Sequence, residues 1–432
     1  MTSLQRALLA LLFGVAATAP VRGEILIRWD QDQIPAPMSL GISTVVVPAT
    51  NSVAVRAAIA QGYRVFVELE GPSLTAATPL PKGVAGAVVK GKSTPPQLLN
   101  LRQRLQAPGA RVLALDTQGK WPHIRSNWVT KNKEVLQVTS RSAQPWIENN
   151  AALVRIARGL HPDDVPLMTY AWTPITLSDV DEGPALHNYL VAIAEAGSYG
   201  ADLILPLHDR FQKRLLLGQP EARADWNEIR RYVEFYSWSL AARYRPIANI
   251  GIVADEPMQW FEVMNLLLRH NLPFELVAPS QLGTRDLTPF DVIIAFDSLT
   301  GKPADAIARF AKNGGRVLQN MKPVTDPNAF ALEVRQLLGR EHRVIDIWNG
   351  ITVLAAPYAE PDEKTVLLTV VNYAEQPVPV QLQIQGAFSL VQYESPEEPA
   401  SLLPYQHRDG FTQFVIPRLR IGGRVFLSPE RK

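Results

Sequence analysis

The chain has 432 residues, of which 47% are hydrophobic and 19% charged, with a formal net charge of +2 and no cysteine. The lack of cysteine excludes disulfide bonds and thiolate metal sites. The small net charge argues against nucleic acid as a partner, because phosphate binding needs a surplus of Lys and Arg on one face. A chain of this length and apolar content can build two or three ordinary hydrophobic cores.

Residues 1–23 have the pattern of a signal peptide. One arginine precedes an apolar run over residues 7–17, and Val21 and Gly23 provide the −3 and −1 positions of a cleavage site before Glu24. The apolar run is short for a bilayer span, which needs roughly 20 residues. We expect a secreted or periplasmic protein with no membrane contact after cleavage, with an uncleaved membrane anchor as the alternative. Loss of the two arginines of this segment leaves 41 basic residues against 41 acidic ones.

Residues 24–246 alternate short apolar runs with amphipathic ones, which is the pattern of βαβ units. The runs predict eight strands, at Ile25–Trp29, Thr44–Pro48, Arg64–Glu70, Val84–Lys90, Arg111–Asp116, Glu134–Thr139, Pro166–Trp172 and Ala201–His208. Helical spacing is found at Val53–Gln61, Pro96–Gln106, Trp146–Leu160, Pro184–Gly197 and Trp226–Tyr244. The proline-rich stretch Thr75–Pro81 stands in place of a full helix. Eight such units predict an α/β fold of the (β/α)8 TIM barrel type, with an open doubly wound sheet as the alternative.

The pattern restarts after Pro246. Strands are expected at Ile250–Val253, Phe274–Val277, Phe290–Phe296 and Arg316–Leu318, with helices at Gln259–His270 and Lys302–Lys312. This succession predicts a small flavodoxin-like α/β domain over residues 247–335. The chain has no G-x-G-x-x-G motif there, so no nucleotide cofactor is expected.

Helical spacing disappears from Arg343 onward. Short strands are expected at Ile351–Ala355, Thr365–Val371, Val378–Ile384, Ser389–Tyr393, Phe411–Ile416 and Arg424–Leu427, separated by Pro, Gly and Asp. Such runs predict a C-terminal β-sandwich over residues 341–432.

The order of barrel, small α/β layer and β-sandwich resembles that of the family-42 β-galactosidases. In the middle segment, IANIGIVADEPMQWFEVMNLLLRHNLPFELVAP is followed by LTPFDVIIAFDSLT and AIARFAKNGGRVLQN, a succession similar to the trimerisation domain of that family. Near the C-terminus, LLTVVNYAEQPVPVQLQIQG and FVIPRLRIGGRVFL resemble the sandwich that closes many glycosidases. The resemblance implies a glycosidase-like architecture, a carbohydrate ligand and a homo-oligomer.

The barrel departs from that family at its catalytic positions. The family has an acid/base glutamate at the end of strand 4 and a nucleophilic glutamate at the end of strand 7, where this chain has Lys90 and Trp172. Glycoside cleavage needs one carboxyl group to protonate the leaving oxygen and a second to act on the anomeric side. In this fold, sites are built at strand ends and in the loops beyond them. The candidate catalytic carboxylates are therefore Glu68, Asp116 and Asp209.

Other residues at the strand ends are candidates for substrate binding. Flat indole rings suit the apolar faces of pyranose rings, and polar side chains can bind hydroxyl groups. The candidates are Trp29, Glu70, Lys90, Trp121, Trp172 and His208. Core packing is the alternative for each tryptophan, and a Lys–carboxylate pair that neutralises the rim is the alternative for Glu68 with Lys90. No metal-ligand spacing such as His-Glu-x-x-His occurs, so no metal site is expected.

Two functions stay open at this point. One is an exported glycoside hydrolase-like enzyme acting on oligo- or polysaccharide, and the other is a catalytically inactive barrel that binds glycan or serves as a structural subunit. If the chain turns over a glycoside, Glu68→Gln is expected to abolish activity while leaving folding nearly intact. A lower melting temperature at an unchanged rate would instead mark Glu68 as structural.

Overall fold

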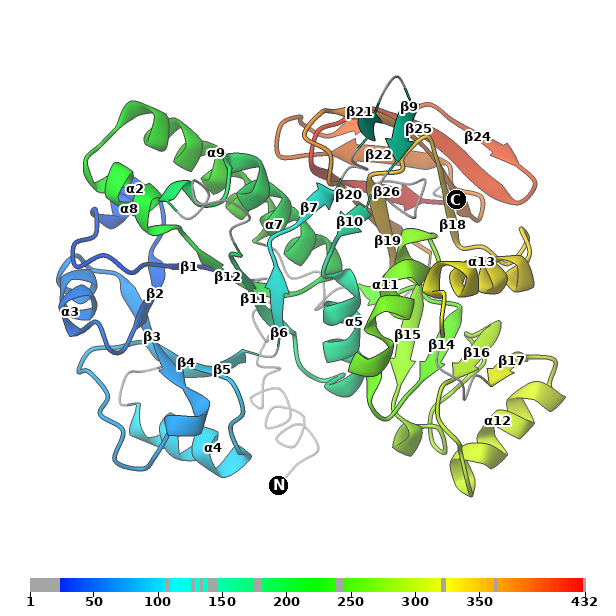
Figure 1. Cartoon of the computed structure of the whole chain (residues 1–432), viewed down its shortest axis with the longest axis horizontal. Coiled ribbons are helices and arrows are strands. Elements are labelled where there is room, and N and C mark those ends of the chain that lie inside the picture. The colour runs from blue at the N-terminus through cyan, green and yellow to red at the C-terminus, as the bar shows by residue number, and fades with distance from the viewer. Residues whose placement is uncertain are drawn as a thin grey trace, which may run out of the picture.

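The computed structural model describes residues 24–429, apart from 106–108, 116, 126–128, 133–134, 139–145, 174–180, 238–243, 320–323 and 361–363. The expected signal segment and Asp116 therefore lie outside the described residues. Figure 1 shows the barrel at the left, a parallel sheet with its helices at the lower right, and the C-terminal strands at the upper right. None of the helices in the described part of the chain has the length and apolar character needed to cross a bilayer.

Eight parallel strands form the barrel, in the order β5-β4-β3-β2-β1-β12-β11-β6. They are β1 (Ile25–Arg28), β2 (Thr44–Pro48), β3 (Arg64–Glu70), β4 (Gly86–Lys90), β5 (Arg111–Leu115), β6 (Thr117–Lys120), β11 (Leu167–Ala171) and β12 (Asp202–Pro206). The outermost strands of this order, β5 and β6, are separated by a single residue in the chain, so the sheet curls round on itself. The TIM-barrel prediction is confirmed, and the open-sheet alternative is not observed.

One predicted barrel strand is wrong. The segment expected at Glu134–Thr139 forms β9 (Val135–Val138), which pairs with β8 (Val129–Asn132) in an antiparallel hairpin outside the barrel. Its place in the barrel is taken by β6, which pairs in parallel with β11. The sequence of β6 is Thr-Gln-Gly-Lys, which lacks the apolar run that marked the other strands. Its strand conformation depends on pairing with residues far away in the sequence. Such pairing leaves no apolar pattern in the segment itself.

Helices cover the outside of the barrel. The main ones are α3 (Ser52–Ala60), α4 (Pro95–Arg104), α5 (Ala151–Leu160), α7 (Leu186–Tyr199) and α9 (Pro220–Tyr236), with the shorter α2 (Pro37–Leu40) and α8 (Asp209–Leu216). After β3 the chain makes only a 3-10 turn at Gly71–Ser73 before β4, as the proline-rich sequence predicted. Between β6 and α5 lie the β8–β9 hairpin and the pair β7 (His123–Arg125) and β10 (Trp146–Glu148).

The barrel interior is filled by one layer of apolar side chains. Its buried members are Leu26, Val46, Phe66, Val88, Leu167 and Ile204, one from each of six strands. The neighbouring residues on the same strands, such as Ile27 and Val65, point outward into the core beneath the helices. Because side chains alternate along a strand, residues two positions beyond this layer also point inward, toward the C-terminal mouth of the barrel.

The middle segment is a second parallel sheet, in the order β15-β14-β16-β17. Its strands are β14 (Ile250–Val253), β15 (Phe274–Val277), β16 (Val292–Ala295) and β17 (Arg316–Gln319), and its helices are α11 (Phe261–Arg269), α12 (Lys302–Lys312) and α13 (Pro327–Leu338). This arrangement matches the predicted flavodoxin-like layer. The homo-oligomer expected from this segment stays a prediction.

The C-terminal strands form two antiparallel sheets that enclose one apolar core. The first has the order β13-β19-β20-β26-β22-β23 and the second β18-β21-β25-β24. The first contains β13 (Arg245–Pro246), β19 (Val353–Ala359), β20 (Val366–Asn372), β26 (Gly422–Ser428), β22 (Leu390–Glu394) and β23 (Ser401–Leu402). The second contains β18 (Ile345–Trp348), β21 (Val378–Gln385), β25 (Phe411–Leu419) and β24 (Tyr405–Arg408). The predicted C-terminal β-sandwich is confirmed.

A buried carboxylate connects the barrel to the sandwich. Glu195 on α7 is fully buried and accepts hydrogen bonds from the backbone and side chain of Asn150, from Tyr170 on β11 and from Tyr373 just after β20. Burial raises the pKa of Glu195, and these four donors oppose that rise. These hydrogen bonds compensate for the burial of the Glu195 carboxylate, which would otherwise be costly. They also hold α7 against the barrel on one side and the sandwich on the other.

Candidate functional site

The mouth of the barrel carries a layer of polar side chains directly above the apolar one. Counting two residues beyond Leu26, Phe66 and Val88 reaches Arg28, Glu68 and Lys90, so alternation directs all three into the barrel. On β11 the same step reaches Thr169, whose hydroxyl donates to the carbonyl of Ile204 on β12 at 2.9 Å. The candidate site is therefore the polar cap of the barrel core.

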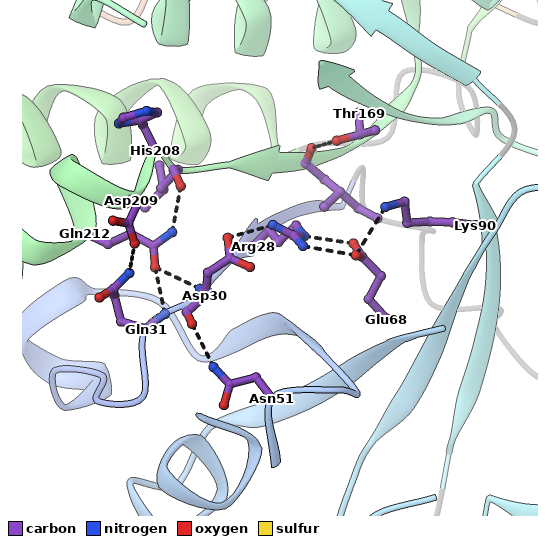
Figure 2. Close-up of polar contacts among 12 residues, drawn as sticks. Arg28, Asp30, Gln31, Asn51, Glu68, Lys90, Thr169, His208, Asp209 and Gln212 are labelled. Atoms are coloured by element: carbon purple, nitrogen blue, oxygen red, sulfur yellow. Dashed lines mark hydrogen bonds and ion pairs between the residues drawn. The ribbon is translucent and has the colours of Figure 1, made fainter. Parts of the chain in front are cut away.

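Arg28 is the centre of this layer (Figure 2). Its Nε and one terminal nitrogen donate to the two carboxylate oxygens of Glu68 at 2.9 and 3.1 Å, and its other terminal nitrogen donates to Asp30 at 2.6 Å. Lys90 approaches Glu68 at 3.4 Å and Glu70 at 3.5 Å. The Glu68 side chain is only 8% exposed, so its charge is balanced almost entirely by protein groups. Lys90 is a partner of Glu68, as expected, but Arg28 makes the shorter contacts.

Asp30 is held at the start of the loop after β1. Its backbone nitrogen donates to the side chain of Gln212, which is fully buried in α8, at 2.8 Å. Its carbonyl accepts from Asn51, the N-cap residue of α3, at 2.8 Å. Burial raises the pKa of the Asp30 carboxyl, Arg28 opposes the rise, and the Glu68 carboxylate adds to it. A proton is therefore retained on Asp30 to a higher pH than on an ordinary aspartate.

His208 and Asp209 begin α8 on the other side of Asp30. Asp209 is 54% exposed and forms an ion pair with Lys213, one helical turn later, at 2.5 Å, and it also accepts a hydrogen bond from Gln31. The bond from Lys213 lowers the pKa of Asp209. His208 caps the helix, with its Nδ1 accepting from the backbone of Arg210 at 3.4 Å. These contacts fit a capping role for the His208–Asp209 pair.

Two of the three tryptophans expected to bind sugar are core residues. Trp29 is fully buried because it points outward from β1, and its Nε1 donates to the carbonyl of Gln33 at 2.8 Å. Trp121 is also buried and stacks on Tyr170 with ring centroids 5.3 Å apart. Neither ring presents an open face to the mouth, so both match the packing alternative.

Trp172 differs from them because it lines a cavity of about 530 Å³ beside the mouth. Its ring meets Trp121 edge-on, with centroids 6.5 Å apart. The cavity lies where the end of β11, the start of α7 and helices α8 and α9 meet. Its wall combines aromatic rings with charged and amide side chains, among them Tyr189, Asn188, Arg210 and Asp225. A volume in this range is usual for small-molecule sites.

No protein-family model matches the sequence, and no curated protein sequence matches it. In structure, the chain is similar to α-L-fucosidase isoenzyme 2 from Paenibacillus thiaminolyticus, with a TM-score of 0.60 and 11% identity over 95% of this chain and 100% of that one. The chain therefore shares the overall fold of that structure. The β-galactosidase from Bacillus circulans sp. alkalophilus has a TM-score of 0.43 at 10% identity, over 86% of this chain and 65% of that one. The GH42 exo-carrageenase from Bacteroides ovatus has a TM-score of 0.41 at 10% identity, over 88% of this chain and 54% of that one.

The barrel brings together Glu68, Glu70 and Lys90 from the set expected at the strand ends, and Asp30 and Arg28 join them. Arg28 was missed because the sequence Ile-Leu-Ile-Arg reads as an apolar strand that simply ends. The signal that could have revealed Arg28 is a charge two residues beyond an inward-facing leucine. In the described part of the chain, no group of three or more His, Asp or Glu is placed to hold a metal ion.

Proposed function

We propose that this chain is an exported glycoside hydrolase that acts on oligo- or polysaccharide through carboxylates at the barrel mouth. The observation that carries the proposal is the Arg28 bridge, which holds Asp30 and Glu68 at the C-terminal ends of β1 and β3. That end of the barrel is where enzymes of this fold perform their chemistry. Two carboxyl groups in one polar cluster are the minimum that glycoside cleavage requires.

The two carboxyl groups have different surroundings, which assigns them different roles. Burial raises the pKa of Asp30 above that of an ordinary aspartate, and we therefore assign Asp30 as the general acid that protonates the leaving oxygen. Glu68 forms ion pairs with Arg28 and Lys90, and we assign it to the anomeric side. Arg28 then acts as a positioning residue, since its planar guanidinium fixes both carboxyl groups through separate edges.

The Trp172 cavity is the proposed place for a sugar ring. An indole face suits the apolar face of a pyranose, and Asn188, Asp225 and Arg210 provide donors and acceptors for hydroxyl groups. The cavity opens beside α8, the helix whose Gln212 also anchors Asp30. We propose that an oligosaccharide extends from this cavity to the carboxylates.

The test is a screen of purified Glu24–Lys432 against chromogenic 4-nitrophenyl glycosides and unlabelled oligosaccharides. On a substrate that is turned over, Asp30→Asn and Glu68→Gln should each lower kcat by about 10²-fold or more. The control is Glu221→Gln, which changes an exposed carboxylate on α9 and should leave kcat unchanged. The same measurement on Asp209→Asn decides whether Asp209 takes part.

The pH dependence provides a second readout. If Asp30 must be protonated to act, the rate should fall as pH rises through its raised pKa, and this fall should disappear in Asp30→Asn. Wild-type kcat in both Asp30→Asn and Glu68→Gln would refute the assignment. Binding of oligosaccharide without any turnover would instead support an inactive, glycan-binding barrel.

A further inference from the structure

The opposite end of the barrel contains a buried carboxylate with an unusual partner. Asp202, the first residue of β12, is 8% exposed. Its Oδ1 accepts a hydrogen bond of 2.8 Å from the backbone nitrogen of Glu24, the residue before β1. The carbonyl of Glu24 accepts from Leu203 at 2.9 Å, so the position of Glu24 is fixed by the barrel itself. Within the described residues, this backbone nitrogen is the one hydrogen-bond donor to the Asp202 carboxylate.

The charges around Asp202 do not balance in the unprocessed chain. The side chain of Glu24, just before β1, faces Asp202 and is paired with Arg111 from β5. On the third side, β11 places the uncharged Leu167 beside Asp202. Two carboxylates therefore share one guanidinium, which leaves one negative charge in excess. Burial raises the pKa of Asp202 to about 6, as expected for a carboxylate that lacks a cation of its own.

We propose that proteolytic removal of residues 1–23 creates a free α-ammonium group on Glu24 that forms a buried ion pair with Asp202. An α-amino group has a pKa of about 7.7–8.0 and is mostly protonated at neutral pH. Cleavage before Glu24 would replace an uncharged amide by an ammonium at the same atom, 2.8 Å from the carboxylate. The cluster of Glu24, Asp202, Arg111 and the new amino terminus is then neutral. Charge-assisted hydrogen bonds of this kind are shorter and roughly twice as strong as neutral ones.

Asp202 then stabilises the correctly processed chain more than any other form. A chain cut at an earlier bond, or still carrying the leader, retains an amide at Glu24 and an unbalanced carboxylate below the barrel. In a chain cut before Glu24, the existing hydrogen bond between Glu24 and β12 becomes an ion pair. This role is independent of the proposed glycosidase activity, because it concerns the end of the barrel opposite the site.

The test compares four proteins. One begins at Glu24 with a free amino terminus, released from a fusion partner by a protease that leaves no extra residue, and one carries Gly-Ser before Glu24. Each is also made with Asp202→Asn. At pH 7 the authentic form should melt higher than the extended form by about 2 °C or more, and Asp202→Asn should remove this difference. Acetylation of the authentic amino terminus should lower its melting temperature to that of the extended form.

The pH range over which the ion pair stabilises the protein follows from the direction in which each pKa shifts. The ion pair raises the pKa of the α-amino group, so its stabilisation is present below about pH 8 and is lost as pH rises further. It lowers the pKa of Asp202 relative to the extended form, so the stabilisation is also lost at acidic pH. N-terminal sequencing of the exported protein should give Glu24. Equal melting temperatures at pH 7, a difference that survives Asp202→Asn, or a native chain beginning at another residue would each overturn the proposal.

Discussion

The contact between Arg28 and Glu68 allows a quantitative prediction for Glu68→Gln. The amide keeps the shape of the side chain but places an N–H2 group against the N–H groups of Arg28, so one of the two short hydrogen bonds becomes a donor–donor contact. Glu68 is 8% exposed and its arginine partner 24%, so solvent compensates little for the loss. Hydrogen bonds to charged groups contribute about 1.5–3 kcal/mol each. The expected loss of unfolding free energy is therefore about 2–3 kcal/mol.

Urea unfolding followed by tryptophan fluorescence measures this loss directly, and calorimetry should record a fall of roughly 5–10 °C in the melting temperature. The matched control is Glu70→Gln on the same strand, since Glu70 is 63% exposed and lies 3.5 Å from Lys90. Exposed ion pairs contribute little, and we expect less than about 1 kcal/mol for it. Equal destabilisation by the two substitutions would show that the Arg28–Glu68 contact contributes no more than an exposed ion pair. The contacts of Glu68 differ from the expectation drawn from the sequence, since Glu68→Gln should lower stability as well as any turnover.

Three further predictions concern the surroundings of the site. Trp172→Ala should weaken oligosaccharide binding at least about tenfold in a titration because it removes the ring at the cavity wall, whereas Trp348→Ala, on the sandwich, should leave binding unchanged. Gly183→Ala should lower the melting temperature clearly more than Gly62→Ala. Both glycines have positive φ, so the backbone strain of the two substitutions is similar. An added Cβ at Gly183 would lie 2.3 Å from the ring of the histidine that caps α8, whereas Gly62 has open space around it. Tyr373→Phe removes a donor to the buried glutamate of α7 and should cost about 1.5–3 kcal/mol in urea unfolding.

The amino-acid sequence by itself determined most of the elements and their order. Solid apolar runs such as Thr44–Pro48 and Arg64–Glu70 became strands with the predicted limits, because parallel strands covered on both faces must be apolar nearly throughout. The same reasoning located the strands of the middle sheet, where Ile250–Val253 and Phe274–Val277 also have their predicted limits. It failed at β6, whose four residues carry no such pattern.

Only the tertiary structure decided which polar residues meet. Glu68 was predicted as a strand-end carboxylate, but its main partner comes from a strand 40 residues earlier, and nothing in the local sequence specifies which inward-facing charges share a barrel layer. The same limit applies to Trp29, which the sequence places at the mouth and the structure buries, since one residue of register reverses the face of a strand. It applies equally to Asp202, whose partner Glu24 lies 178 residues away. The periodicity of a segment determines which of its faces is buried. Which side chains from different segments meet in a site is determined only when the strands close into the barrel.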